Sequence, residues 1–467
     1  MADANVAELA KELAETKQLV IAGQTALNIV WTLVTGFLVM FMQAGFALVE
    51  TGLTRAKNVA HTMGMNFLVY SIGVLGFWVM GFALQMGGVG ALSTFGNDAT
   101  LSREFVIAIG GHDFGLFGMQ GFLLSPAVYT APVAALFLFQ MVFMDTAATI
   151  PTGAMAERWR FSSFVAFSFV LSAFMYPIFG NWVWGGGWLS QLGKNFGLGH
   201  GHVDFAGSSV VHMVGGVAAL TGAKILGPRA GKFGLDGKPR PIPAHNVPMV
   251  VLGTFILAFG WFGFNPGSTL SGTDTRIAVI AVNTMLASAA GAFGSYVYLR
   301  ARFGSPDVSM MCNGMLAGMV AITAPCAFVT APAAVFIGLV AGMLVIASAL
   351  FIETTLKIDD PVGASSVHGT CGIWGVISLG LFADGRYGDG WNGVAGPVRG
   401  LFYGDASQLA AECIGVLACV VWVATITFVT FKVLALFTAQ RVPLEDERIG
   451  LDVPEMGIEG YTAEVGE

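Results

Sequence analysis

Charged side chains are scarce in this sequence. Only 11% of its 467 residues are Asp, Glu, Lys or Arg, whereas 55% are hydrophobic, and the mean hydropathy is +0.73. Because a soluble globular chain is about a quarter charged, the composition excludes an ordinary soluble enzyme, a disordered protein and a nucleic-acid-binding protein. We therefore expect a single membrane domain surrounded by a lipid bilayer, with no nucleic acid among its partners.

Cysteine and catalytic motifs are also scarce. The five cysteines have no metal-ligand spacing, and small buried side chains are their expected role. No P-loop, nucleophile elbow, zinc motif or dinucleotide-binding fingerprint occurs in a convincing context. We therefore expect no enzyme activity, no metal site and no cofactor. The cysteines are Cys312, Cys326, Cys371, Cys413 and Cys419.

Long apolar runs are abundant. A membrane-spanning helix needs about 20 largely apolar residues, and the sequence predicts an all-α polytopic membrane protein with eleven such helices. The predicted spans are 27–49, 63–86, 123–150, 161–183, 205–226, 246–264, 275–299, 307–324, 327–352, 364–382 and 408–437. We expect three parts: an extracellular N-terminal segment, the membrane domain, and a cytoplasmic C-terminal regulatory tail. These parts are residues 1–24, 25–437 and 438–467.

Basic residues predict the orientation. Lys and Arg are concentrated in one set of alternate loops, which should be cytoplasmic; the N-terminus is then outside and the C-terminus inside. Only Pro325 and its neighbours separate the eighth and ninth spans. If these two spans were one long kinked helix, the later loops would lie on the other side of the membrane and would no longer agree with the positions of the basic residues. The expected location is the inner (plasma) membrane, crossed many times. The basic residues of the rich set are Arg55, Lys57, Arg158, Arg160, Arg229, Lys232, Lys238, Arg240, Arg300, Arg302 and Lys357, and those of the poor set are Arg103, Lys194, Arg276, Arg386 and Arg399.

One motif occurs twice. Asp204 begins DFAGSSVVH and Asp360 begins DPVGASSVH, and each motif ends in a histidine, His212 or His368. The copies open the fifth and tenth spans, so they cross the membrane in opposite directions, as in a five-plus-five inverted repeat. Eight residues of helix rise about 12 Å. Each histidine should therefore reach the middle of a core about 30 Å thick from its own face.

The two histidines are the main functional candidates. Ionisable groups at this depth are costly and usually functional. A neutral imidazole donates from one nitrogen and accepts at the other, so His212 and His368 can line a path for a small neutral molecule and relay a proton. Structural hydrogen bonding and bis-histidine haem ligation remain alternatives. Asp204 and Asp360 are suited to helix capping, and Asp204 can also attract a cation at the outer face.

Aromatic residues and a few acids complete the set of candidates. The aromatic side chains near the outer span ends fit an interfacial belt or a cation-binding site. Glu50 and Asp145 lie in apolar segments, where each can face a cavity or pair internally. Glu157 is expected in an ion pair at the cytoplasmic end. The aromatic residues are Phe139, Phe143, Trp182, Trp184, Trp188, Trp261, Phe262 and Phe264.

Several longer motifs carry a family resemblance. From about residue 27 to about residue 455, the chain resembles the ammonium transporter family (Amt/Mep/Rh), and within it the prokaryotic Amt branch. The motifs are GAMAERWRF, NWVWGGGWL, DFAGSSVVHMVGGVAAL, GWFGFNPGSTL, MCNGMLAGMVAIT and SSVHGTCGIWGV. The resemblance implies a homotrimer with one pore per subunit, each built of eleven helices in a five-plus-five inverted repeat plus a last helix.

The resemblance also assigns roles. The chain is expected to be an ammonium/ammonia transporter or channel that recruits ammonium, or methylammonium as an analogue, at an outer aromatic site. It then removes the proton and conducts ammonia, with or without that proton, past the twin histidines. The implied residues are Trp184, Ser268 and Phe139 for recruitment, Phe143 and Phe264 for the gate, His212 and His368 for the pore, Asp204 for the outer carboxylate, and Gln140 and Trp261 for the lining.

The tail and three departures bear on regulation. The sequence RVPLEDERIGLDVPEMGIEGY resembles the family's cytoplasmic region, which couples subunits and helps to bind PII-class signal proteins. The alternative function is accordingly an ammonium sensor that signals through such a partner with little flux. Glu50, Asp145 and a longer loop between Trp184 and Asp204 depart from the family pattern and concern transport rate and gating.

Overall fold

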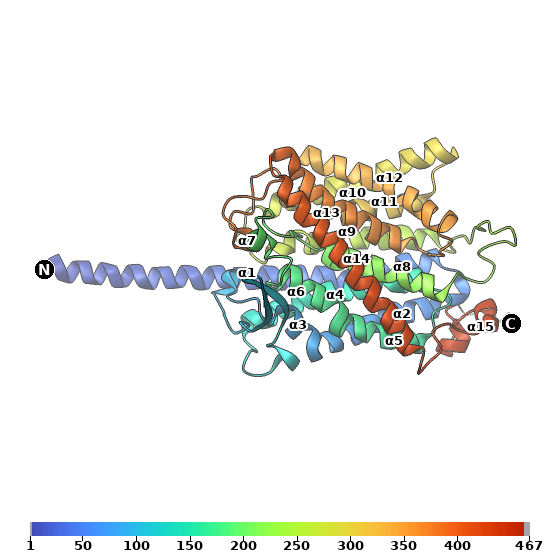
Figure 1. Ribbon diagram of the computed structural model, residues 1–467, viewed down its shortest axis with the longest axis horizontal. Helices are drawn as coiled ribbons and strands as arrows, with labels where there is room; N and C mark the ends of the chain where they lie inside the picture. Colours follow the sequence, from blue (N-terminus) through green and yellow to red (C-terminus); the bar gives the residue numbers. More distant parts are fainter. Residues whose placement is uncertain (1, 462–467) are drawn as a thin grey trace, which may run out of the picture.

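The chain folds into a bundle of long helices with its two termini at opposite ends (Figure 1). The computed structural model describes residues 2–461, and side chains from residue 5 onward. Met1 and residues 462–467, the extremities of the predicted N-terminal segment and tail, lie outside the described residues.

Most of the bundle consists of helices able to span a bilayer. Within residues 2–461, nine helical stretches are long and apolar enough to cross a membrane. In several of them a wider π-helical turn adjoins or interrupts the α-helix, and in two a tighter 3₁₀ turn adjoins it; both kinds of turn are labelled η. Their elements are α1 (Ala2–Leu53), η1 (Ala56–Asn58), α2 (Val59–Gly76), η2 (Phe77–Gly81), α3 (Phe82–Met86), α4 (Ala131–Met155), α5 (Phe161–Val170), η5 (Leu171–Met175), α6 (Tyr176–Trp184), η6 (Ser208–Met213), α8 (Val214–Leu226), α9 (Val247–Phe264), η7 (Pro266–Thr269), α10 (Ile277–Phe303), α12 (Ala331–Thr354) and α14 (Ala406–Leu434).

Two further helical stretches occupy the remaining predicted spans. They are α11 (Val308–Thr323) and the pair formed by η8 (Ser365–Thr370) and α13 (Cys371–Phe382). A non-helical turn around Pro325 separates α11 from α12, so the eighth and ninth predicted spans are two helices. The positions of the predicted spans therefore agree with the observed helices, although several starts differ, most of all those of the first and third spans.

The first and third spans begin at other residues than predicted. Residues 2–24 belong to α1, because the helix continues without a break from Ala2 to Leu53. Helix α4 begins at Ala131 rather than at residue 123, since the Thr130 hydroxyl accepts a hydrogen bond from Val133 N at 3.3 Å. The apolar residues before this cap form turns, so hydrophobicity alone placed the start too early.

The all-α prediction missed a β-hairpin in the loop between α3 and α4. Strand β1 (Glu104–Ile109) pairs antiparallel with β2 (His112–Gly118). Gly110 and Gly111 connect the strands with φ of 63° and 84°, a conformation that glycine adopts without strain and that two-residue hairpins require. The smaller elements outside the spans are η3 (Ser93–Phe95), η4 (Phe122–Leu124), α7 (Leu192–Phe196), η9 (Trp391–Gly393), η10 (Leu401–Tyr403), α15 (Leu444–Ile449) and η11 (Asp452–Met456).

Small residues bring the helices close together. A Cβ added at Gly253 of α9 would lie 2.7 Å from the carbonyl oxygen of Gly45 in α1. A Cβ at Gly342 of α12 would lie 2.0 Å from the carbonyl oxygen of Gly291 in α10. Such backbone contact is typical of membrane helices, which associate through packing.

The basic loops and the C-terminal tail meet at one end of the bundle, opposite α7 (Figure 1). The Lys57 ammonium donates to the Glu447 carbonyl at 2.8 Å, and the Arg441 guanidinium donates to the Leu226 carbonyl at 2.9 Å. The Glu455 carboxylate accepts from Phe161 N at 2.8 Å. The described part of the tail is thus packed against the membrane domain.

Candidate functional site

The two repeated motifs begin with similar backbone geometry. In each, a glycine with positive φ precedes a π-turn: Gly207, with φ of 112°, precedes η6, and Gly363, with φ of 75°, lies two residues before η8. Isolated π-turns are rare and often occur at functional sites. Each turn carries one of the paired histidines, His212 or His368.

Asp204 caps the first motif. Its carboxylate accepts hydrogen bonds from four consecutive backbone N–H groups, those of residues 207–210, at 2.7–2.9 Å. The Ser209 hydroxyl donates a further bond at 2.6 Å. The side chain therefore satisfies the first turn of its helix, as capping requires.

Asp360 caps the second motif more sparsely. It accepts from the backbone N–H groups of Gly363, Ala364 and Ser365 at 2.7–3.1 Å. Both aspartates therefore have the capping geometry that the sequence predicts.

The two motifs bring their histidines into contact. His212 Nδ1 and His368 Nδ1 are 3.1 Å apart, and the ring centroids are 5.2 Å apart. One nitrogen must donate and the other accept across this contact. His212 is fully buried and His368 is nearly so. The sequence prediction was that each histidine reaches the middle of the membrane core, and this contact is consistent with it.

A haem between the histidines does not fit the observed distance. A metal ion between two imidazole nitrogens needs about 2 Å to each of them, whereas the two Nδ1 atoms are 3.1 Å apart. Within the described residues, no group of three or more His, Cys, Asp or Glu side chains could hold a metal ion.

Aromatic rings continue from the histidines in one direction. The Phe264 ring lies 5.3 Å from His212 and stacks on Phe143 at 4.1 Å between centroids. Phe139 follows Phe143 at 4.6 Å. The Trp261 ring lies 5.3 Å from His212 and 5.5 Å from Phe264, and its indole N–H donates to the Thr323 hydroxyl at 3.1 Å. The stacked phenylalanines therefore lie between His212 and Phe139.

A cavity of about 200 Å³ lies beyond the phenylalanine pair. Trp184 is half-buried at its wall, and its indole N–H donates to the Asp204 carbonyl at 2.7 Å. The Ser268 hydroxyl donates to the Phe264 carbonyl at 2.8 Å, which leaves its lone pairs available to a guest. The predicted residues that line this cavity are Trp184, Ser268, Phe139, Phe143, Gln140 and Asp204.

The path on the other side of the histidines is narrow and then widens. His368 and Glu50 line a small cavity of about 20 Å³, and a larger cavity of about 650 Å³ adjoins it. Asn313 and Val362 line both. The Glu50 carboxylate accepts from Thr152 and Asn66 at 2.7 Å each. The sequence left two options for Glu50, facing a cavity or pairing internally, and in the structure its side chain faces a cavity.

Asp145 occupies a different place from the pore residues. It is buried in α4, and its Oδ1 has no hydrogen-bond partner among the described residues. It lines none of the three cavities described above.

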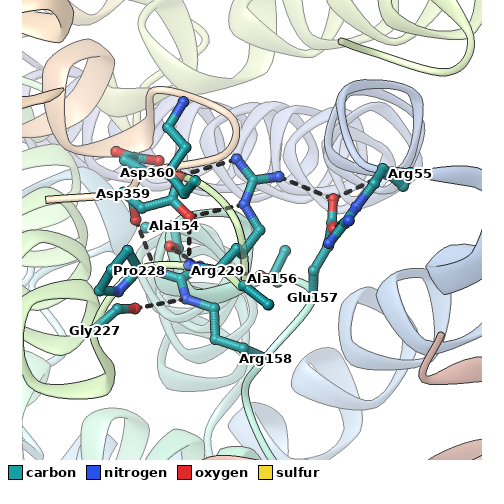
Figure 2. Close-up of polar contacts among 12 residues, drawn as sticks. Arg55, Ala154, Ala156, Glu157, Arg158, Gly227, Pro228, Arg229, Asp359 and Asp360 are labelled. Atoms are coloured by element: carbon teal, nitrogen blue, oxygen red, sulfur yellow. Dashed lines mark hydrogen bonds and ion pairs between the residues drawn. The ribbon is translucent and has the colours of Figure 1, made fainter. Parts of the chain in front are cut away.

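An ionic network closes the bundle near the tail. Figure 2 shows Arg229 between Asp359 and Glu157. Its guanidinium donates to the Asp359 carboxylate at 2.8 and 3.0 Å and to Glu157 at 3.0 Å, while Arg55 pairs with the other oxygen of Glu157. The predicted ion pair of Glu157 thus exists, but its partners are Arg55 and Arg229.

Arg158 has a different role in the same network. Its guanidinium donates to four backbone carbonyls at 2.7–3.1 Å and so provides hydrogen-bond donors for carbonyl groups near the ends of helices and loops (Figure 2). Although burial tends to raise the pKa of Asp359, its hydrogen bonds and charge contact with Arg229 hold that pKa well below the usual value. Asp359 is therefore a carboxylate at neutral pH.

The sequence interpretation missed a buried His–Glu pair behind Asp204. His202 Nδ1 lies 2.6 Å from a Glu412 oxygen, and His202 Nε2 lies 2.9 Å from the Ser209 hydroxyl that donates to Asp204. Burial tends to lower the pKa of His202, but the Glu412 carboxylate raises it overall. Glu412 is an acid inside the predicted span 408–437, and this was the available signal.

Comparison with known proteins identifies relatives over nearly the whole chain. The model of the Ammonium Transporter Family matches residues 30–461. The chain is 44% identical to ammonium transporter Amt2 of Archaeoglobus fulgidus over 464 residues, covering 98% of this chain and 92% of that protein. It is 36% identical to ammonium transporter Amt1 of Haloferax mediterranei, covering 94% of this chain and 80% of that protein.

Solved structures share the fold. A sensor Amt protein superimposes with a TM-score of 0.80 at 35% identity, covering 93% of this chain and 99% of that chain. Mep2 of Candida albicans superimposes with a TM-score of 0.73 at 28% identity, covering 89% and 85%. Together with the many apolar helices, these similarities describe a multi-pass membrane protein. The chain belongs to the ammonium transporter family.

Proposed function

We propose that the chain transports ammonium or ammonia across a membrane along the path from the outer cavity to the histidine pair. The observation that carries this proposal is the unbroken series of contacts from the 200 Å³ cavity through Phe143 and Phe264 to His212 and His368. Relatives named as ammonium transporters support the substrate.

Recruitment takes place in the cavity beside Trp184. The faces of Trp184 and Phe139 attract a cation, and the Ser268 hydroxyl can accept one of its hydrogen bonds because its own proton is bound to the Phe264 carbonyl. The capped Asp204 carboxylate adds a fixed negative charge to the wall. The ion is thereby concentrated before the gate.

Passage requires ammonium to lose water and its proton. Phe143 and Phe264 stack at 4.1 Å and leave no space for a hydrated ion until they move. Ammonia then crosses between groups that accept or donate hydrogen bonds, His212 and His368. The proton either returns outside or travels along the histidine pair. Potassium is rejected because it cannot give up a proton and cross as a neutral species.

The membrane topology and assembly belong to the same proposal. The protein lies in the plasma membrane. The end of the bundle that carries the C-terminal tail and the basic loops faces the cytoplasm. The two halves form a five-plus-five inverted repeat. Three copies assemble as a homotrimer with one pore each. Residues 1–24 are outside, the membrane domain extends from 25 to 437, and residues 438–467 form the regulatory tail.

The decisive experiment is an electrical measurement on reconstituted protein. Solid-supported-membrane currents under an ammonium pulse should show charge movement if the proton accompanies ammonia, and a parallel pH-dye assay should detect electroneutral flux. His212→Ala should change the flux or its selectivity against potassium, whereas His112→Ala in the exposed hairpin should not. Well-inserted protein that gives neither current nor pH change would refute the proposal.

A sensor function is the second candidate, because the sensor Amt protein has 35% identity and a TM-score of 0.80. In that case the tail, with Glu447, Asp452 and Glu455 held against the membrane domain, signals to a PII-class protein. Ammonium should then alter binding of that protein while flux stays negligible. Substantial flux with no ammonium-dependent binding would exclude the sensor.

A further inference from the structure

Helix α1 extends well beyond the bundle as a single exposed helix (Figure 1). Its free part carries apolar side chains that are largely exposed: Val6 at 68%, Leu9 at 69%, Leu13 at 55% and Val20 at 53%. A free helix of this length is marginal in water, and exposed leucine and valine add no stability to it. We therefore expect another surface to cover these exposed apolar side chains.

Most of the exposed apolar residues follow a heptad pattern, whereas Leu19 and Ile21, 75% and 55% exposed, lie outside it. Starting at Val6 the residues of the pattern recur at alternating intervals of three and four residues, which are the a and d positions of a coiled coil. The pattern keeps its phase from the free part of α1 into the part that lies within the bundle. Thr16 and Gly23 are its two positions without a large apolar side chain. The a and d residues are Val6, Leu9, Leu13, Thr16, Val20, Gly23, Leu27, Val30, Val34, Phe37 and Phe41.

The charged residues fit copies of the same helix in parallel register. Glu12 falls at a g position and Lys17 at the e position of the next heptad. In a parallel coiled coil these positions face each other across the interface. An antiparallel pair would instead place g beside g and e beside e, and so bring like charges together. Lys11 and Glu15 lie on the opposite face and pair within the helix at 3.8 Å.

A lipid surface fits this helix less well. Helix α1 continues from its membrane-spanning part without a break or kink. At about 1.5 Å per residue, residues 6–20 extend roughly 20 Å along the axis of that span. A helix that continues straight along a spanning axis leaves the membrane rather than lying on it. The stripe of residues 6–20 is therefore available to protein.

We propose that residues 6–20 of α1 form a parallel, in-register coiled coil with the same segment of further copies of this chain. The stripe that is exposed in one copy is buried between copies. The phase continues through Leu27, Val30 and Val34, which are 49%, 56% and 47% exposed. In the proposed homotrimer, the coiled coil therefore extends the same stripe from the membrane parts of neighbouring copies to the region outside the bundle. It holds the subunits together outside the bundle and is independent of whether the pore conducts.

Disulfide cross-linking of the full chain in membranes tests the proposal. Cys413 is the exposed cysteine and is first replaced by alanine; the other four are buried. Leu9→Cys or Leu13→Cys then places a thiol at the core of the coiled coil, and Lys11→Cys places one on its outer face. Mild oxidation should give covalent dimers with Leu9→Cys and Leu13→Cys and none with Lys11→Cys. Equal cross-linking at all three positions, or none at any, would overturn the proposal.

Charge reversal provides a second readout that does not depend on apolar packing. Glu12→Lys places two cations opposite each other and should reduce cross-linking through Leu9→Cys. Adding Lys17→Glu restores opposite charges across the interface and should restore cross-linking. Failure of the double variant to recover would contradict the parallel register. Flux measured on the same samples separates this result from the transport proposal, because the free part of α1 does not line the pore.

Discussion

The Asp204 and Asp360 motifs have similar sequences but different surroundings. Asp204 accepts bonds from four backbone N–H groups and one hydroxyl, and a buried His202–Glu412 pair lies behind it. Asp360 accepts from three backbone N–H groups and neighbours the network of Arg229 and Asp359. The same capping interaction is thus found beside an aromatic cavity at one end of the bundle and beside an ionic network at the other.

The largest expected difference comes from removing the two caps. Asp204→Ala leaves four buried N–H groups without an acceptor and should lower the free energy of unfolding by at least about 4 kcal/mol, whereas Asp360→Ala should cost about 2 kcal/mol. Unfolding in mixed detergent micelles measures both values. Asp113→Ala in the exposed hairpin is the control. Equal costs would show that the two caps are equivalent despite their different bond numbers.

The charged end should lose stability in acid. Asp359→Asn breaks a buried pair and should cost about 3 kcal/mol at neutral pH. Because the pKa of folded Asp359 lies below its unfolded value of about 3.9, its contribution is present above that pH and is lost as the pH falls through the folded pKa. Thermal unfolding of wild type and variant should therefore converge in acid.

The control for this prediction is Asp236→Asn, which removes a carboxylate from an exposed pair with Lys238 at 4.0 Å. Exposed pairs contribute little, so its unfolding should follow that of wild type at every pH. A gap between wild type and Asp359→Asn that stays constant in acid would contradict the assigned ion pair.

Equivalent serines should differ by a smaller amount. Ser209→Ala removes the hydroxyl that donates to Asp204 and should cost about 1–2 kcal/mol. Ser365 occupies the equivalent position after Asp360, and its hydroxyl has no hydrogen-bond partner among the described residues. Ser365→Ala should therefore be nearly neutral in the same unfolding assay. A larger cost at Ser365 would reverse the comparison.

The smallest expected effect is on recruitment. Trp184→Leu removes the cation-attracting face and should weaken ammonium binding by about 1 kcal/mol, which is roughly a fivefold rise in the half-saturating concentration. Trp182→Leu is the matched control, because Trp182 donates to the Leu116 carbonyl and does not line the cavity. Flux against ammonium concentration measures both variants, and equal shifts would remove the special role of Trp184.

Much of the fold was predictable because its signals are local. Apolar runs placed the helices, and the two motifs predicted that each histidine lies near the middle of the membrane core. The start of α4 was placed wrongly, since apolar residues before Thr130 form turns instead of helix. The hairpin was missed although Gly110 and Gly111 are a recognised turn signal.

The contacts of charged residues were less predictable because they join distant segments. Arg229 and Asp359 are 130 residues apart, and His202 and Glu412 lie in segments separated by several helices. Composition and periodicity show that such residues lie near span ends, but they do not identify partners. Arg158 illustrates this point, since its guanidinium binds backbone carbonyls and not the adjacent Glu157.

The contact between the two Nδ1 atoms gives the path a direction. If His212 donates its Nδ1 proton, its Nε2 is an acceptor, and His368 must carry its own proton on Nε2 as a donor. To reverse these assignments, the shared proton must pass to His368 Nδ1, while His368 Nε2 releases its proton and His212 Nε2 takes one up. A molecule beside the histidines therefore meets one acceptor and one donor, and their order is set by the shared proton together with the two Nε2 positions.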